Sequence, residues 1–199
     1  MKKVISVMLC FCLLLSGCAS YNASRLPSKD PFSFANYQQK DGLIMAAQFL
    51  SASDSKKVFG VSNLYKKFQP VYITIENKTG ETYDFKKSML NKRTTSAEEV
   101  AEICKFNTAG RATTYGVAGL FLWPLLIPAV VDGVGSSNAN SKMQDDFAFK
   151  EIRDDRIQPN GMLSGVVFLE KMKDGETLDI RLQNVGDNNI VLFTSFIPT

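Results

Sequence analysis

Three pairs of adjacent acidic residues are the first groups in this chain that could do chemistry. They are Glu98 with Glu99, Asp145 with Asp146, and Asp154 with Asp155. Two carboxylates can serve as acid and base in hydrolysis or as calcium ligands. Adjacent residues of a helix point in different directions, however, and a calcium loop interleaves several oxygen ligands with a glycine. None of the pairs has that context, so solvated surface charge is the simpler interpretation.

The 199-residue chain contains no histidine. Because histidine is the most common general base and metal ligand, the Ser-His and Cys-His arrangements that activate a nucleophile are excluded. Residues 110–119 lack the Lys-Ser/Thr of a phosphate-binding loop, and no dinucleotide-binding glycine spacing is present. We therefore expect no enzyme, no cofactor, no metal and no small-molecule substrate.

A small basic cluster follows an expected strand; it consists of Lys86 and Lys87 with Lys92 and Arg93. Such a cluster can contact lipid headgroups or peptidoglycan. A solvated loop is the alternative, and the sequence leaves both open.

The first 18 residues predict the compartment. Lys2 and Lys3 precede an apolar stretch, residues 4–15, which is long enough for a signal peptide but too short to span about 30 Å of hydrocarbon. The stretch ends in Leu15-Ser16-Gly17-Cys18. This motif resembles the lipobox of bacterial lipoproteins, in which small residues admit the peptidase and the cysteine sulfur receives diacylglycerol.

The resemblance implies that residues 1–17 are a signal peptide and that the mature protein begins at lipidated Cys18. Fatty acids such as palmitate would anchor it stably, and Ala19, in place of Asp, implies the outer membrane, with the domain on its periplasmic face. The alternative is an ordinary secretory signal with a chance cysteine.

Removal of the signal peptide would change the net charge and the number of cysteines. Two of the 23 Lys and Arg residues lie in it, so the net charge falls from +3 to +1, and nothing supports a nucleic-acid partner. Cys10 and Cys12 also leave, and Cys18 is used by the lipid. Cys104 cannot then form an internal disulfide, and its place on the apolar face of an expected helix predicts a small buried hydrophobe.

The elements that must position these groups begin after a tether. Residues 18–41 are rich in Ser, Asn, Pro and Lys, and we expect a lipidated N-terminus and flexible tether that hold a domain about 25 Å from the bilayer. Residues 42–199 form that domain. A short helix over residues 53–60, capped by a serine or aspartate and stopped by Gly60, follows its first strand.

Alternating and β-branched segments predict at least six strands. The expected strands are residues 43–49, 71–76, 81–85, 162–169, 177–182 and 190–197. A turn over 77–80 would fold 81–85 back as the hairpin partner of 71–76. Short strands at this spacing predict a mainly β protein, an antiparallel two-layer β-sandwich.

A helical, apolar insertion, about residues 96–152, interrupts the sandwich. Ser96 and Glu99 match a capping box, which predicts a helix over 96–105, and a second helix is expected over 138–152 after a break at 133–137. Between them residues 115–131 carry no charge but contain Pro124 and Pro128.

The apolar stretch 115–135 has three interpretations: it dips into a leaflet or is covered by partners, it packs on the sandwich, or it spans the membrane. The two prolines argue against a span. The expected membrane or partner contacts are Leu120, Phe121, Leu122, Trp123, Leu125, Leu126 and Ile127.

Several segments together resemble a group of uncharacterised bacterial envelope lipoproteins with an immunoglobulin-like domain. The segments are Ala46-Ala47, Phe59-Gly60, Pro70-Val71, Ile75-Glu76-Asn77-Lys78, Pro159-Asn160-Gly161 and Ser164-Gly165-Val166-Val167-Phe168. The resemblance implies an immunoglobulin-like sandwich and brings no catalytic residues. We expect a non-catalytic binding or assembly module whose partners are the membrane and envelope proteins. The alternatives are a membrane-active oligomer whose apolar insertion enters the bilayer, and a hydrolase that uses an Asp pair.

Overall fold

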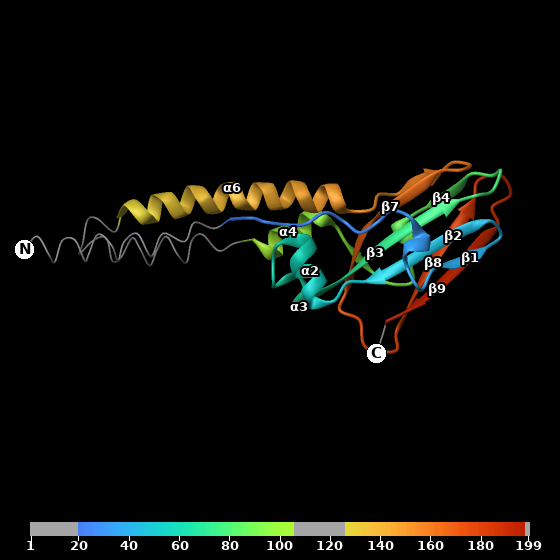
Figure 1. Cartoon of the computed structure of the whole chain (residues 1–199), viewed down its shortest axis with the longest axis horizontal. Coiled ribbons are helices and arrows are strands. Elements are labelled where there is room, and N and C mark those ends of the chain that lie inside the picture. Colours follow the sequence, from blue (N-terminus) through green and yellow to red (C-terminus); the bar gives the residue numbers. More distant parts are fainter. Residues whose placement is uncertain (1–19, 106–125, 198–199) are drawn as a thin grey trace, which may run out of the picture.

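The protein is mainly β, with two antiparallel sheets (Figure 1). The computed structural model describes residues 20–105 and 126–197, and of residues 126–136 only the backbone. Within these residues, sheet A has five strands in the order β1 (Gln38–Lys40), β2 (Leu43–Phe49), β3 (Phe68–Asn77), β7 (Met162–Glu170) and β5 (Thr94–Thr95). Sheet B has the order β6 (Asp155–Ile157), β4 (Tyr83–Phe85), β8 (Thr177–Asn184) and β9 (Ile190–Phe196).

A core of alternate strand residues joins the two sheets, as the sequence predicts for a sandwich. Val71, Ile73 and Ile75 of β3 are fully buried on the face toward sheet B. The opposing side chains come from β4, β6, β8 and β9, and include Phe85, Leu178, Ile180, Leu182 and Phe193. Period-two alternation places these residues on one face of each strand, which confirms the two-layer arrangement.

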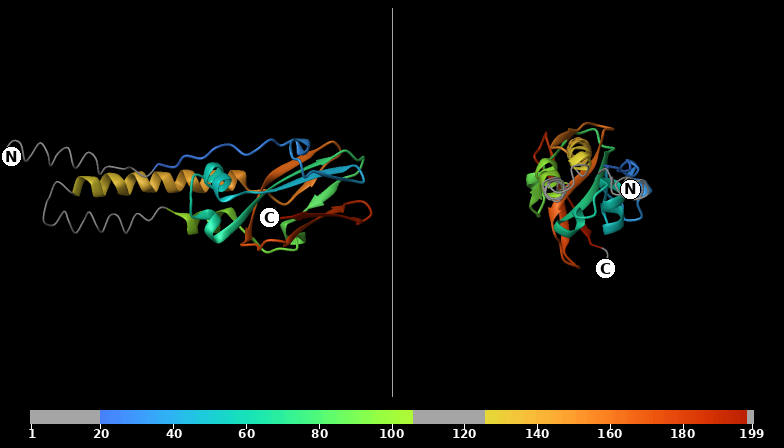
Figure 2. Two further views of the ribbon diagram at one scale, coloured as in Figure 1. Left: turned by 60° about the horizontal axis from the view of Figure 1, so that its bottom comes forward. Right: turned by 90° about the vertical axis from the view of Figure 1, so that its left-hand side faces the viewer.

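The other face of sheet A is also apolar, and it is covered by helices at one end of the body (Figure 2). The helices are α2 (Ala52–Phe59), α3 (Leu64–Lys67), α4 (Ala97–Cys104) and α6 (Leu126–Lys150). Phe59 of α2, Phe147 of α6 and Phe168 of β7 form the centre of this second core, with ring centroids 4.7, 5.3 and 5.7 Å apart. Helices therefore form a third layer over part of the sandwich.

Local signals set the helix ends. The Ser51 hydroxyl caps α2 by accepting from the Asp54 N–H (3.1 Å), and Gly60 ends the helix in the left-handed conformation. The predicted helix and its glycine stop are confirmed, although the cap lies earlier than expected. In α4, Ser96 accepts from the Glu99 N–H, as the capping box predicts.

The expected hairpin between residues 71–76 and 81–85 is wrong. Strand β4 does exist there, but it lies in sheet B between β6 and β8. Both edges of β3 are already taken by the longer strands β2 and β7. After β3 the chain crosses to sheet B, and the buried Asn77 amide stabilises this crossing by donating to the carbonyls of Glu81 (2.7 Å) and Ile157 (2.9 Å).

Helix α6 also differs from the expectation of a break at 133–137. It is continuous from Leu126, and Pro128 is tolerated because it lies in the first turn, where the backbone N–H has no intrahelical partner. The helix ends at Lys150 rather than Ile152, because the Ile152 N–H bonds to the carbonyl of Val166 (3.0 Å). Gly165 allows this approach, since a Cβ there would lie 2.6 Å from the Ile152 nitrogen.

The segment expected to be a flexible tether lies against the body. We call residues 20–30 the strap. The Ser24 N–H donates to the carbonyl of Lys57 (2.9 Å), and the Tyr72 hydroxyl donates to the carbonyl of Ser28 (3.2 Å). A short 3-10 helix, η1 (Pro31–Ser33), and strand β1 follow. The strap is ordered because its carbonyls satisfy hydroxyl groups on the outer face of sheet A.

The aromatic centre of the helical layer offers a stability test with a matched control on the same helix. Phe147→Ala should lower the free energy of unfolding by about 3–5 kcal/mol, because it opens a cavity among Phe59 and Phe168. Phe149 is 85% exposed, so Phe149→Ala should change it by no more than about 0.5 kcal/mol. Denaturant unfolding followed by circular dichroism measures both; equal effects would contradict the assigned packing.

Candidate functional site

Figures 1 and 2 show the beginning of the strap, the C-terminal end of α4 and the beginning of α6 toward the same end of the long axis, the end that carries α2, α3 and α4. Residue 18 is two positions before the strap. This end of the body is therefore the candidate functional site, and its side chains are described in turn.

A buried charged cluster fixes the strap to α6. The Lys150 ammonium is almost fully buried and lies 2.5 Å from the Asp146 carboxylate, and it also donates to the carbonyl of Val58 (2.6 Å). The Tyr21 hydroxyl donates to the same carboxylate at 2.5 Å. Burial, with the nearby Asp146 charge, raises the pKa of Tyr21, so the hydroxyl stays protonated as a donor.

The strap then runs closely over α2. Gly60 has φ of +67° and a Cβ there would lie 2.5 Å from the carbonyl oxygen of Asn22, so only glycine fits beneath the strap. Beside this crossing is a hollow of about 460 Å³. Its lining consists of Asn22, Ala23, Ser24, Ser53, Lys56 and Lys57, with no carboxylate.

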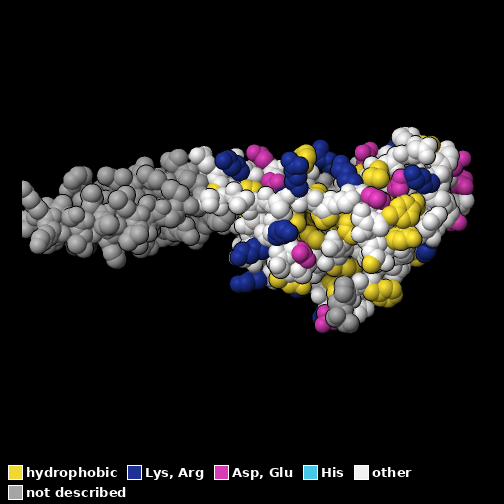
Figure 3. Space-filling view, in the orientation of Figure 1, with side chains coloured by type: hydrophobic (Ala, Val, Ile, Leu, Met, Phe, Trp, Pro, Cys, Tyr) yellow, Lys and Arg dark blue, Asp and Glu magenta, His cyan; other side chains and the backbone are white. Residues whose placement is uncertain are grey.

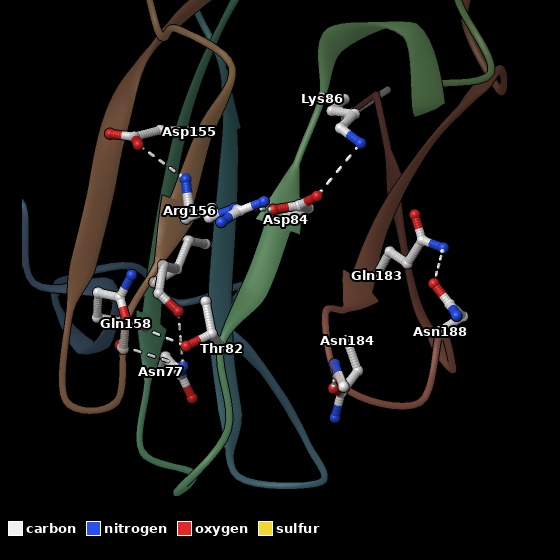
Figure 4. Close-up of polar contacts among 12 residues, drawn as sticks. Asn77, Thr82, Asp84, Lys86, Asp155, Arg156, Gln158, Gln183, Asn184 and Asn188 are labelled. Atoms are coloured by element: carbon white, nitrogen blue, oxygen red, sulfur yellow. Dashed lines mark hydrogen bonds and ion pairs between the residues drawn. The ribbon is translucent and has the colours of Figure 1, made fainter.

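The basic cluster that the sequence singles out is paired with carboxylates, one close in the sequence and three from distant parts of the chain. Lys86 lies 3.2 Å from Asp84, which also lies 3.3 Å from Arg156 (Figure 4). Each of the other three basic side chains has its own carboxylate. The pairs are Lys87 with Glu151 (2.8 Å), Lys92 with Glu176 (2.7 Å) and Arg93 with Glu170 (3.7 Å).

Four other lysines were not anticipated. Lys56 and Lys57 lie in the last turn of α2, and Lys66 and Lys67 in the last turn of α3. All four are exposed, and within the described part of the chain none forms an ion pair with a carboxylate. The sequence feature that could have identified them is the presence of two Lys-Lys doublets in consecutive short helices. We call these residues the α2–α3 lysine surface.

The acidic pairs are used structurally or lie at the surface. Asp145 is exposed, whereas its neighbour Asp146 holds Lys150 and Tyr21. Asp154 accepts from the Lys87 backbone N–H (2.8 Å). Asp155 accepts from the backbone N–H of Arg156 (2.8 Å), and Glu98 and Glu99 are exposed in the first turn of α4. No group of three or more Cys, Asp or Glu side chains in the described residues could hold a metal ion.

Cys104 is buried against α6 and sheet A, which confirms the expectation of a small apolar core residue. Burial raises the pKa of its thiol to about 11, although the nearby Lys67 charge acts in the opposite direction. At neutral pH the thiol is therefore protonated.

The remaining predicted site residues are not described. Cys18 and the contacts Leu120, Phe121, Leu122, Trp123 and Leu125 lie outside the described residues; Leu126 and Ile127 begin α6, where the backbone alone is described. Among the described residues, no helix combines the length and the apolar character needed to cross a membrane.

No protein-family model, curated protein or solved structure matches this chain.

The two neighbouring aspartates give a matched pair of variants. Asp146→Ala leaves the buried Lys150 charge without its carboxylate, and should lower the free energy of unfolding by at least about 2 kcal/mol. Asp145→Ala makes the same chemical change at an exposed position and should have an effect below about 0.5 kcal/mol. Thermal and denaturant unfolding measure the difference; similar values for the two variants would refute the structural role of Asp146.

The Cys104 thiol should react slowly in the folded protein. With Cys10, Cys12 and Cys18 replaced by Ser, labelling by an aromatic disulfide at pH 8 should be on the order of 100-fold slower than in denaturant, because the raised pKa leaves little thiolate. The stability that comes from the protonated thiol is complete below pH 9 and is lost as the pH rises through about 11. In Cys104→Ala the free energy of unfolding should not show this decrease at high pH. Equal labelling rates in the folded and unfolded chains would contradict the burial.

Proposed function

We propose that this protein is a lipid-anchored bacterial envelope lipoprotein that acts as a non-catalytic binding or assembly module. Its lipid would be carried by Cys18, in the outer membrane, with the domain on the periplasmic side. The observation that carries the proposal is the attachment of the strap to α2 and α6 within a few residues of Cys18.

This attachment limits how far the body can stand from its anchor. A fully extended chain spans at most about 3.6 Å per residue, so the six residues from Cys18 to Ser24 reach about 20 Å. Acyl chains on Cys18 would therefore hold the α2 end close to the headgroups, instead of leaving the domain on a long mobile tether.

A surface for an envelope protein is offered by the edge strand β9. Its alternate side chains Ile190, Leu192 and Phe196 are exposed. Figure 3 shows hydrophobic side chains gathered over the broad end of the body, beside β1 and β9. Lys40 donates to the Leu192 carbonyl (2.6 Å) and Gln38 to the Thr194 carbonyl (2.9 Å), so two open carbonyls of the edge are already occupied. We infer that a partner would meet the side-chain face of β9 and would not extend the sheet.

The fold fits this use. We propose that the two antiparallel sheets belong to the immunoglobulin-like class, in which a rigid sandwich presents edges and loops for binding. The acidic pairs support a non-catalytic role, because Asp146 and Asp154 are already bound within the fold.

The alternative is a membrane-active oligomer. It is favoured by the beginning of α6, which contains part of the apolar stretch 115–135 and lies toward the end of the body where the strap begins (Figure 1). Carbonate extraction of the chain with Cys18→Ala separates the two functions: the binding module should be released from membranes, whereas retention would favour insertion of the apolar segment.

Replacement of the anchor tests the main proposal. Behind a leader that ordinary signal peptidase removes, Cys18→Ala should move the protein from the membrane to the soluble periplasmic fraction, because no acyl chain remains. Cys104→Ala is the matched control and should stay in the membrane fraction. Mass spectrometry of the native chain should show a diacylglyceryl group on Cys18; an intact leader or an unmodified Cys18 thiol would refute the proposal.

A further inference from the structure

We propose that the α2–α3 lysine surface binds anionic phospholipid headgroups, so that the body lies directly on the bilayer that holds its anchor. This inference rests on the proposed lipid anchor and goes beyond it: it names the chemistry that the anchored end meets. The four residues concerned are Lys56, Lys57, Lys66 and Lys67.

The first support is uncompensated charge. Three basic side chains of the cluster anticipated from the sequence, Lys86, Lys87 and Lys92, each lie within 3.2 Å of a carboxylate. The lysine surface has no such partner in the residues that the structure describes. A position in the last turn of a helix favours a cation through the helix dipole, but it leaves the exposed ammonium free to bind an anion.

The second support is location. Lys and Arg side chains gather over α2 and α3, at the end of the body toward which the strap begins (Figure 3). The Ser24 N–H is bonded to the carbonyl of Lys57 itself. An acyl group on Cys18 would therefore keep this lysine within about 20 Å of the bilayer, whatever the orientation of the rest of the body.

The third support is shape. The hollow of about 460 Å³ beside the crossing of the strap and α2 is lined by Lys56, Lys57, Ser53 and strap residues 22–24, and none of these residues is acidic. Ammonium and hydroxyl donors around a concave space match the oxygens of a phosphodiester.

Electrostatics makes the contact effective only when the protein is anchored. Charge attraction to an anionic leaflet extends over a Debye length of about 8 Å at physiological salt. Four lysines alone bind such a surface weakly. The anchor supplies a high local concentration, so weak contacts are enough to fix the orientation of the body.

The test places a fluorophore on the loop between the two helices. Ser62→Cys provides an exposed thiol there, while Cys104 is buried and Cys18 would carry lipid. The full lipidated chain is reconstituted in phosphatidylcholine vesicles with or without about one-third phosphatidylglycerol, a composition in the range of anionic membranes. Quenching by a nitroxide on the lipid headgroup reports contact between the helices and the bilayer.

We expect quenching to be strong only with phosphatidylglycerol and to fall when salt is raised to about 0.5 M. Changing the four lysines to Gln should lower the contact equilibrium at least about tenfold. The control changes four basic residues elsewhere, Lys78, Lys86, Arg153 and Arg156, to Gln; it should retain the quenching, because these residues lie outside α2 and α3.

Quenching that does not change with lipid charge, with salt or with the lysine substitutions would overturn the inference, while the proposal of a lipid anchor would stand. Flotation with neutral vesicles measures the anchor separately. A native chain that fails to float with any vesicle would overturn both the lipid anchor and the placement of the lysine surface.

Discussion

The burial of sheet A on both of its faces is the constraint on which the rest of the structure depends. In β3, Val71, Ile73 and Ile75 face sheet B, while Phe68 and Tyr72 face the helices and the strap. An antiparallel sheet commonly leaves one face to solvent. Here neither face of the central strands can be exposed to solvent, because each face carries large apolar side chains. Sheet B must cover one face, and α2, α4, α6 and the strap must together cover the other.

This requirement turns the N-terminal segment from a spacer into part of the body. The hydroxyl groups of Tyr72 and Thr74 on the outer face of sheet A need acceptors, and carbonyls of the strap supply them. The buried Lys150 needs a carboxylate, and Asp146 provides it while also accepting from Tyr21. The distance between the domain and any anchor at Cys18 is therefore set by packing on sheet A, and not by the statistics of a flexible chain.

The same packing decides which charges are available for binding. Clusters of like charge look equivalent along the chain, but the fold brings carboxylates to one of them and not to the other. Lys87 and Lys92 meet Glu151 and Glu176, which are 64 and 84 residues away in the sequence. The α2–α3 lysine surface faces solvent beside the strap. The fold therefore leaves these four lysines, unlike the anticipated cluster, available to an anion from outside the described residues.

The sequence by itself determined most elements and few of their partners. Alternation marked β3, β7, β8 and β9, a capping serine and apolar spacing marked α4, and the same spacing placed Cys104 in the core. These signals are local, because strand and helix periods act over a few residues. Only the tertiary structure decided that β4 joins sheet B, that the strap is packed, that α6 begins at Leu126, and that the anticipated basic cluster is paired while four lysines are not. Each of these outcomes depends on which residues, distant in the sequence, compete for the same strand edge, sheet face or charged group. A local sequence pattern contains no information about that competition.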